Sequence, residues 1–217
     1  MTTTQPDAIL AWHFLPADRK LRFPPHTLVE VGQTLDHDGQ LKMCESGLHA
    51  SVRAIDALDY APGPVVCRVE CWGDVEQGAD KLVCRHRRVL AMADVTRELH
   101  LFACDEAERA LALVDADPRS VEAIRVKRLW VDGKATDHEL DAARDAARDA
   151  ASAAAWDAAR DAASAAAWDA ASAAAWSAAW SALSSAARAA ASAAARDAAN
   201  ARLEAVLTKA IGMEDAT

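Results

Sequence analysis

The sequence predicts an α+β protein. A small mixed sheet with one helix is expected in residues 1–93, followed by an alanine-rich antiparallel helical domain in residues 94–217. Before the boundary, apolar residues form short runs or alternate with polar ones, which is typical of strands. After it, apolar residues recur every three or four positions, which is typical of helices. No glycine or proline interrupts the chain between Gly133 and Gly212, so this stretch lacks helix breakers.

The first domain is expected to hold several strands and one helix. The clearest strand signal is the segment PVVCRVECW, in which valine and cysteine side chains collect on one side. Ser51 is suited to cap a helix that continues to Asp59, with Val52, Ile55 and Leu58 on one apolar face. The expected strands are residues 8–15, 21–23, 64–72 and 81–92.

The second domain is expected to begin with two amphipathic helices. The first runs from Asp94 to about Asp115, because its apolar residues follow a helical period. Pro118 separates it from the second helix, which Ser120 caps and which ends before Gly133.

An alanine-rich run follows these helices. Thr136 and Glu139 form a capping box that starts it, and four-residue units such as Arg-Asp-Ala-Ala then repeat to about residue 200. A period of four advances about 400° on an α-helix, so the alanine stripe drifts by about 40° per unit. We therefore expect either a right-handed coil or antiparallel pieces, with one break near residues 183–185 and a second within residues 150–155.

Four tryptophans stand in the alanine-rich run: Trp156, Trp168, Trp176 and Trp180. Facing alanines bury little area, so these side chains could be wedges that fill the space between helices. Tryptophan is also enriched at binding hot spots, which makes the same four the candidate partner-binding residues. Alanine stripes can pair between chains as well, in which case the run would form a homo-oligomer.

Charge and cysteine content narrow the classes of function. The 217 residues carry a net charge of −9 and a pI near 5.2, which argues against nonspecific binding to nucleic acid or to an anionic membrane. Five cysteines, without an N-terminal apolar signal segment, predict free thiols and a cytoplasmic location. These cysteines lack the paired spacing of zinc ligands, so we expect no metal and no cofactor.

Two segments resemble an uncharacterised domain of phage and bacterial proteins. Residues 29–34 (VEVGQT) and 44–51 (CESGLHAS) are similar to the VGKTY and CE(S/R)GFHAC segments of that domain. Leu48 stands where Phe is usual, and Ser51 stands where a second Cys is usual, which argues against a disulfide or metal role for that pair. This resemblance implies no activity.

A further resemblance concerns residues 102–114 (FACDEAERALALV), residues 117–124 (DPRSVEAI) and the capping box at Thr136. These segments are similar to a family of bacterial proteins classed as immunity proteins, which also continue into alanine-rich helices. The resemblance implies a non-enzymatic, cytoplasmic binding protein of phage or bacterial conflict systems that occludes a protein partner. This is the expected function.

The strand-helix-strand layout of residues 47–69 looks like the element that supports NAD in ADP-ribosyltransferase-type domains. The resemblance implies that His13 contacts the nicotinamide ribose and that Tyr60 stacks or packs nearby. The catalytic glutamate of those enzymes has no counterpart before Ala93, and His49 and Tyr60 could equally pack at a seam between sheet and helix. An NAD-dependent ADP-ribosyltransferase-like domain on a helical scaffold is the alternative function, and a self-associating structural protein is the third.

Overall fold

The chain divides into two compact units in this computed structural model. The sheet unit consists of residues 1–99 and 198–217, and the helical unit consists of residues 100–197. The structure describes residues 7–23, 25–113, 117–150 and 177–213, and in the last of these segments it describes side chains from residue 192 onward. The C-terminal end of the chain therefore belongs to the same unit as the first strand.

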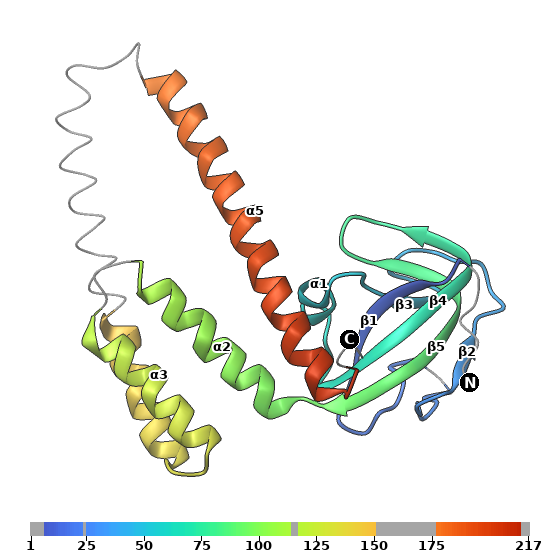
Figure 1. Ribbon diagram of the computed structural model, residues 1–217, viewed down its shortest axis with the longest axis horizontal. Coiled ribbons are helices and arrows are strands. Elements are labelled where there is room, and N and C mark those ends of the chain that lie inside the picture. Colours follow the sequence, from blue (N-terminus) through green and yellow to red (C-terminus); the bar gives the residue numbers. More distant parts are fainter. Residues whose placement is uncertain (1–6, 24, 114–116, 151–176, 214–217) are drawn as a thin grey trace. The chain divides into compact units, whose positions relative to one another are not determined.

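The sheet unit is built on a five-stranded sheet in the order β1-β4-β5-β2, with β3 paired to β5 (Figure 1). The strands are β1 (Ile9–Leu15), β2 (Thr34–Asp36), β3 (Leu48–Ala50), β4 (Val65–Gln77) and β5 (Leu82–Asp94). The sequence predicts a mixed sheet, but every strand pair in the described residues is antiparallel. A short turn joins β4 to β5, and strands connected in this way must run in opposite directions.

A strand expected at residues 21–23 does not form. Instead, the backbone there turns back on itself as an irregular hairpin, with an isolated bridge between Lys20 and Leu28. The Leu21 N–H donates to the Thr27 carbonyl at 3.0 Å. We call residues 20–23 and 25–28 the basic hairpin.

One face of the sheet forms the hydrophobic core of the sheet unit. Ala11 of β1 and Cys67 and Val69 of β4 are fully buried on this face. Because side chains alternate along a strand, His13 shares the face of Ala11 while Trp12 points to the opposite side. The alternation therefore carries one titratable side chain onto the core face of β1.

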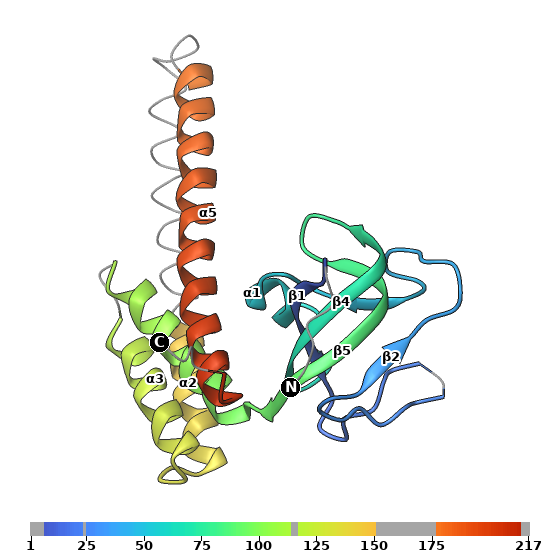
Figure 2. The same ribbon diagram turned by 45° about the vertical axis from the view of Figure 1, so that its right-hand side comes forward.

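Helix α1 (Ala54–Leu58) lies beside β1 (Figures 1 and 2). The sequence predicts a longer helix capped by Ser51, and this is wrong, because Ser51 pairs with the backbone of β1 and no side chain of its own segment caps α1. The caps come from the end of the chain. The Ala54 N–H donates to Glu204 Oε1 at 3.3 Å, and the Ile55 N–H donates to Asn200 Oδ1 at 3.0 Å.

The helical unit contains most of α2 (Thr96–Leu111), all of α3 (Pro118–Val131) and a helix over residues 137–150. The sequence predicts Ser120 as the cap of α3, but Asp117 caps it, and its carboxylate accepts from the Arg119 N–H at 2.9 Å. Proline is favoured at the first helical position, so the helix begins at Pro118 and Ser120 lies within its first turn.

Side-chain contacts hold α3 to the elements on either side of it. Arg128 Nη2 donates to Asp105 at 2.6 Å and to Glu108 at 2.8 Å, and both of these carboxylates belong to α2.

The capping box is confirmed, because Glu139 accepts from the Thr136 N–H at 2.8 Å and its own N–H donates to the Thr136 hydroxyl at 3.2 Å. The sequence therefore located this helix start correctly.

Helix α5 (Ser177–Ala210) is continuous, so the break predicted near residues 183–185 is wrong. Serine in a helix interior costs only about half a kcal/mol relative to alanine, and the flanking alanines support the helix on both sides. The second predicted break, within residues 150–155, extends beyond the described residues. In the sheet unit, Leu203 and Leu207 of α5 are fully buried. Among the described helices, none combines the length and hydropathy needed to cross a membrane.

Candidate functional site

The sheet unit contains a cleft of about 720 Å³. Its lining comes from β1, the basic hairpin, the loop that leads into β3, the end of α1 and one residue of β5. These segments are distant in sequence, and the antiparallel pairing of β1, β4 and β5 brings them together. Clefts of this size are typical of small-molecule sites.

We call His13, His49 and Arg87 the floor of the cleft. The Arg87 Nη1 donates to the His49 carbonyl oxygen at 2.6 Å, which ties β5 to the end of β3. Arg87 is only 2% exposed, and its Nε has no hydrogen-bond partner in the described part of the chain. Burial lowers the pKa of Arg87, yet a guanidinium of this kind remains charged at neutral pH. The floor therefore carries a buried positive charge.

Both histidines of the floor are neutral at neutral pH. Burial is the main cause that lowers the pKa of His13 well below its usual value, and the charges of Arg87 and His49 act in the same direction. A hydrogen bond with the His49 backbone opposes this shift. Burial also lowers the pKa of His49. The floor thus combines one cation with two uncharged imidazole rings.

The ring of His49 fixes the loop that forms one wall of the cleft. The Cys44 N–H donates to His49 Nε2 at 2.9 Å, and His49 Nδ1 lies 3.2 Å from the Gly47 carbonyl oxygen. Nε2 is therefore the acceptor and Nδ1 carries the proton, since a carbonyl can only accept. His49 acts here as a positioning residue, with both ring nitrogens engaged by the loop.

Gly47 is required by the same loop. Its φ of +120° is a conformation that residues with a side chain rarely adopt, and an added Cβ would lie 2.3 Å from Val83 Cγ2. Cys44 also adopts a left-handed conformation, with φ at +67°. The segment CESGLH is thus a folded turn closed by its own histidine ring, which accounts for the glycine and the histidine in physical terms.

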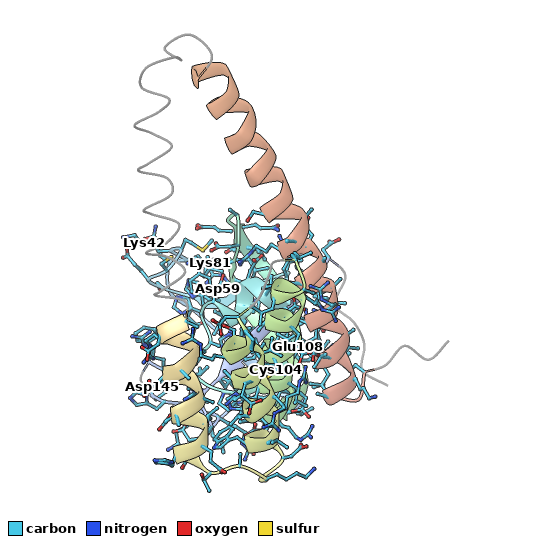
Figure 3. All side chains as sticks on the ribbon, turned by 90° about the vertical axis from the view of Figure 1, so that its left-hand side faces the viewer. Lys42, Asp59, Lys81, Cys104, Glu108 and Asp145 are labelled. Atoms are coloured by element: carbon cyan, nitrogen blue, oxygen red, sulfur yellow. The ribbon has the colours of Figure 1, made fainter. Side chains whose placement is uncertain are left out.

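Tyr60 and Lys81 lie together at the rim of the cleft. Lys81 Nζ is 4.0 Å from the centre of the Tyr60 ring, and the Tyr60 hydroxyl donates to the Asp80 carboxylate. A hydrogen bond with the Cys44 side chain, followed by one with Tyr60, raises the pKa of Lys81. Figure 3 labels Lys81 on the sheet unit. An ammonium group therefore covers one face of the Tyr60 ring.

The cleft is basic and aromatic, although the chain as a whole is acidic. Its aromatic lining residues, apart from histidine, are Trp12, Phe14, Phe23 and Tyr60. Its basic lining residues are Lys20, Arg22, Lys81 and Arg87, and its acidic ones are Asp36 and Glu45. The two acidic groups already have partners: Asp36 lies 2.6 Å from His86 Nδ1, and Glu45 lies 2.7 Å from Lys42 Nζ. The remaining positive charge faces the cleft.

The structure brings both candidate catalytic residues of the sequence analysis, His13 and Tyr60, to this one cleft. Sequence reasoning did not identify Arg87 or Lys81. An arginine among the apolar residues of a strand was the available signal for Arg87, but Arg85 and Arg88 stand beside it, and the sequence does not say which of the three is buried.

The candidate partner-binding tryptophans cannot be assigned a surface. Trp156, Trp168 and Trp176 lie outside the described residues, and the side chain of Trp180 lies outside them too. All five cysteines are free thiols. In the described part of the chain, no group of His, Cys, Asp or Glu side chains is arranged to hold a metal ion.

A protein-family model matches part of the chain. Residues 18–100 match a family described as Domain of unknown function (DUF7666). The match covers less than half of the chain, includes the loop that leads into β3 and names no activity. No curated protein and no solved structure matches the chain.

Proposed function

We propose that the sheet unit binds a nucleotide-type small molecule in its cleft, with NAD-type dinucleotides as the candidate class. The observation that carries the proposal is the composition of the cleft, in which four basic residues and the exposed aromatic residues Phe23 and Tyr60 line one cavity of about 720 Å³. A chain of net charge −9 gains nothing in general from such a cluster, so a ligand of opposite charge is the physical reason for it.

The chemistry of the lining supports a ligand that has both a flat ring and an anionic group. Aromatic side chains provide faces against which a base can stack, and each such contact is worth about 1–3 kcal/mol in nucleic-acid complexes. Lys20 and Arg22 on the basic hairpin are exposed donors suited to phosphate oxygens. Phe23, which is 68% exposed, lies next to them in sequence. Nucleotides combine these two features.

The lining supports binding without group transfer. Transfer of ADP-ribose, in the enzymes that the strand-helix-strand layout resembles, requires a catalytic glutamate. Here the acidic side chains of the cleft are Asp36 and Glu45, which already bond to His86 and Lys42. Lys81 supplies a positive charge beside Tyr60, where it can bind an anion but cannot stabilise a developing positive charge on a ribose ring.

Isothermal titration calorimetry with the full chain tests the proposal. ADP-ribose and NAD⁺ are expected to bind saturably at one site, whereas adenosine, which keeps the ring and lacks the phosphates, is expected to bind at least about tenfold more weakly. A double variant, Lys20→Gln with Arg22→Gln, is expected to lose that preference. Lys209→Gln, an exposed lysine on α5, serves as the matched control.

Two results would contradict the proposal. Absence of saturable binding by all three compounds would remove nucleotide binding as a function of the cleft. Consumption of NAD⁺ by the wild-type protein, lost in His13→Ala, would show that the unit transfers or hydrolyses its ligand, and the binding-only part of the proposal would fall.

A further inference from the structure

Arg87 is a buried cation for which the structure shows no anionic protein partner. It forms no ion pair with any described carboxylate, and its one hydrogen bond is to the neutral His49 carbonyl oxygen. Taking a charge out of water is unfavourable unless another charge or several hydrogen bonds compensate it. The single hydrogen bond to His49 compensates only part of the cost of burying the Arg87 guanidinium.

The other neighbours of Arg87 are thiols and an imidazole. Burial raises the pKa of Cys67 to about 12, and a hydrogen bond with Cys84, together with burial, raises the pKa of Cys71. These two thiols are therefore uncharged at neutral pH. His13 is uncharged as well, because its pKa is lowered. The hydrogen bond with Cys71 lowers the pKa of Cys84, but the Cys84 thiol donates to the Leu48 carbonyl oxygen at 3.2 Å, so it carries a proton in this arrangement.

The position of Arg87 allows its guanidinium to contact a ligand in the cleft. Arg87 lines the floor of the cleft together with His13 and His49, whereas the exposed lysine and arginine belong to the basic hairpin, a different segment of the lining. A ligand phosphate bound by the hairpin leaves this second cationic position unfilled. One end of the ligand would then contact the basic hairpin, and its other end would contact Arg87.

We infer that the ligand carries an anionic group on the ring that reaches the cleft floor, and that Arg87 binds this group. The inference rests on the proposed function and makes it more specific. Among dinucleotides it selects the form whose pyridine ring bears a carboxylate over the form whose ring bears a carboxamide. Arg87 is then the residue that determines specificity, because a carboxylate accepts charge-assisted hydrogen bonds from a guanidinium and an amide oxygen accepts weaker ones.

A matched pair of ligands tests the inference. Nicotinic acid adenine dinucleotide and NAD⁺ differ only in the carboxylate or carboxamide on the pyridine ring, and their affinities for the full chain can be measured by titration calorimetry at pH 7.5. We expect the acid to bind at least about tenfold more tightly to the wild-type protein. Arg87→Met should abolish the preference, and Arg87→Lys should retain part of it.

Arg85→Met is the control, since Arg85 lies on the same strand, bonds to Asp74 and to the His37 carbonyl oxygen, and does not itself line the cleft. If Arg87→Met does not fold, the wild-type preference and the Arg87→Lys variant still decide the question. Equal binding of acid and amide by the wild type would overturn the inference and leave the proposed function standing; a Cys84 thiolate paired with Arg87 would give this result. Failure of both ligands to bind would instead refute the proposed function.

Discussion

At the scale of single residues, burial determines the protonation state of the histidines on the floor of the cleft. His13 lies beside a buried guanidinium, so adding a proton to its ring would place two positive charges together in a region with little water. Both ring nitrogens of His49 form hydrogen bonds with its own loop. The ring of His49 therefore serves to hold the loop, and His13 stays uncharged on the floor of the cleft.

The lowered pKa of His13 predicts that the free energy of unfolding decreases as the pH is lowered. In the unfolded chain His13 takes up a proton near pH 6.5, whereas in the folded protein it does so only at lower pH. Between these two values the unfolded state binds more protons, so folding stability decreases as pH falls, by up to about 1.4 kcal/mol per pH unit. Urea unfolding at about pH 7.5, 6.5 and 5.5 measures this slope.

His13→Asn should flatten the slope, since the variant has no proton to take up at this position. His26→Asn is the control: His26 is exposed in the same unit, and asparagine tolerates its left-handed backbone conformation, with φ at +55°. The same pH slope in wild type and His13→Asn would show that His13 is not the group responsible.

At the scale of elements, α1 depends on the other end of the chain. A helix of five residues is too short to be stable by propensity, and its first N–H groups must find acceptors. Those acceptors are Asn200 and Glu204 of α5. The position of α1, which is followed by Tyr60 at the rim of the cleft, is thus coupled to the docking of the last helix.

We therefore expect Asn200→Ala to destabilise the sheet unit by about 1 kcal/mol, because it removes a helix cap. Asn200→Asp keeps the acceptor oxygen and should recover most of the loss. The midpoint of urea unfolding gives the comparison. If the alanine variant were as stable as the wild type, the contact between α5 and α1 would contribute nothing to stability in solution.

At the scale of the whole molecule, one chain contains two units of different character. The sheet unit holds the cleft, and the helical unit holds the charged and alanine-rich helices. The expectation that the chain occludes a protein partner concerns the alanine-rich run, and it stays a prediction. Nucleotide binding and partner occlusion are compatible, since the sheet unit can bind a small molecule while the helical unit binds a protein.

A pull-down with the full-length protein tests the partner prediction. One protein retained in stoichiometric amount from the native host is expected, and Trp168→Ala with Trp176→Ala should weaken its retention, because large aromatic side chains carry most of the energy at interfaces. The solution mass of the bait separates this from self-association. Retention unchanged by the double variant would remove these tryptophans from the contact surface.

The sequence by itself determined the features that depend on neighbours along the chain. Period-two and helical patterns predicted β1, β4, β5 and the α+β class, and the Thr136–Glu139 capping box predicted a helix start. Tyr60 was selected from the strand-helix-strand layout of residues 47–69, and His13, on the first strand, from the resemblance of that layout to ADP-ribosyltransferase-type domains. The caps of α1 and α3 were mispredicted, because a serine near a helix start is only one of several available acceptors.

Only the tertiary structure decided which side chains share the cleft. The burial of Arg87, in contrast to Arg85 and Arg88, follows from the pairing of β5 with β3 and β4. The covering of Tyr60 by Lys81 and the capping of α1 by Asn200 join residues far apart in sequence. Such contacts arise from the global pairing of strands and helices, which no local propensity or period encodes, and for that reason the chemistry of this site appears only in the folded chain.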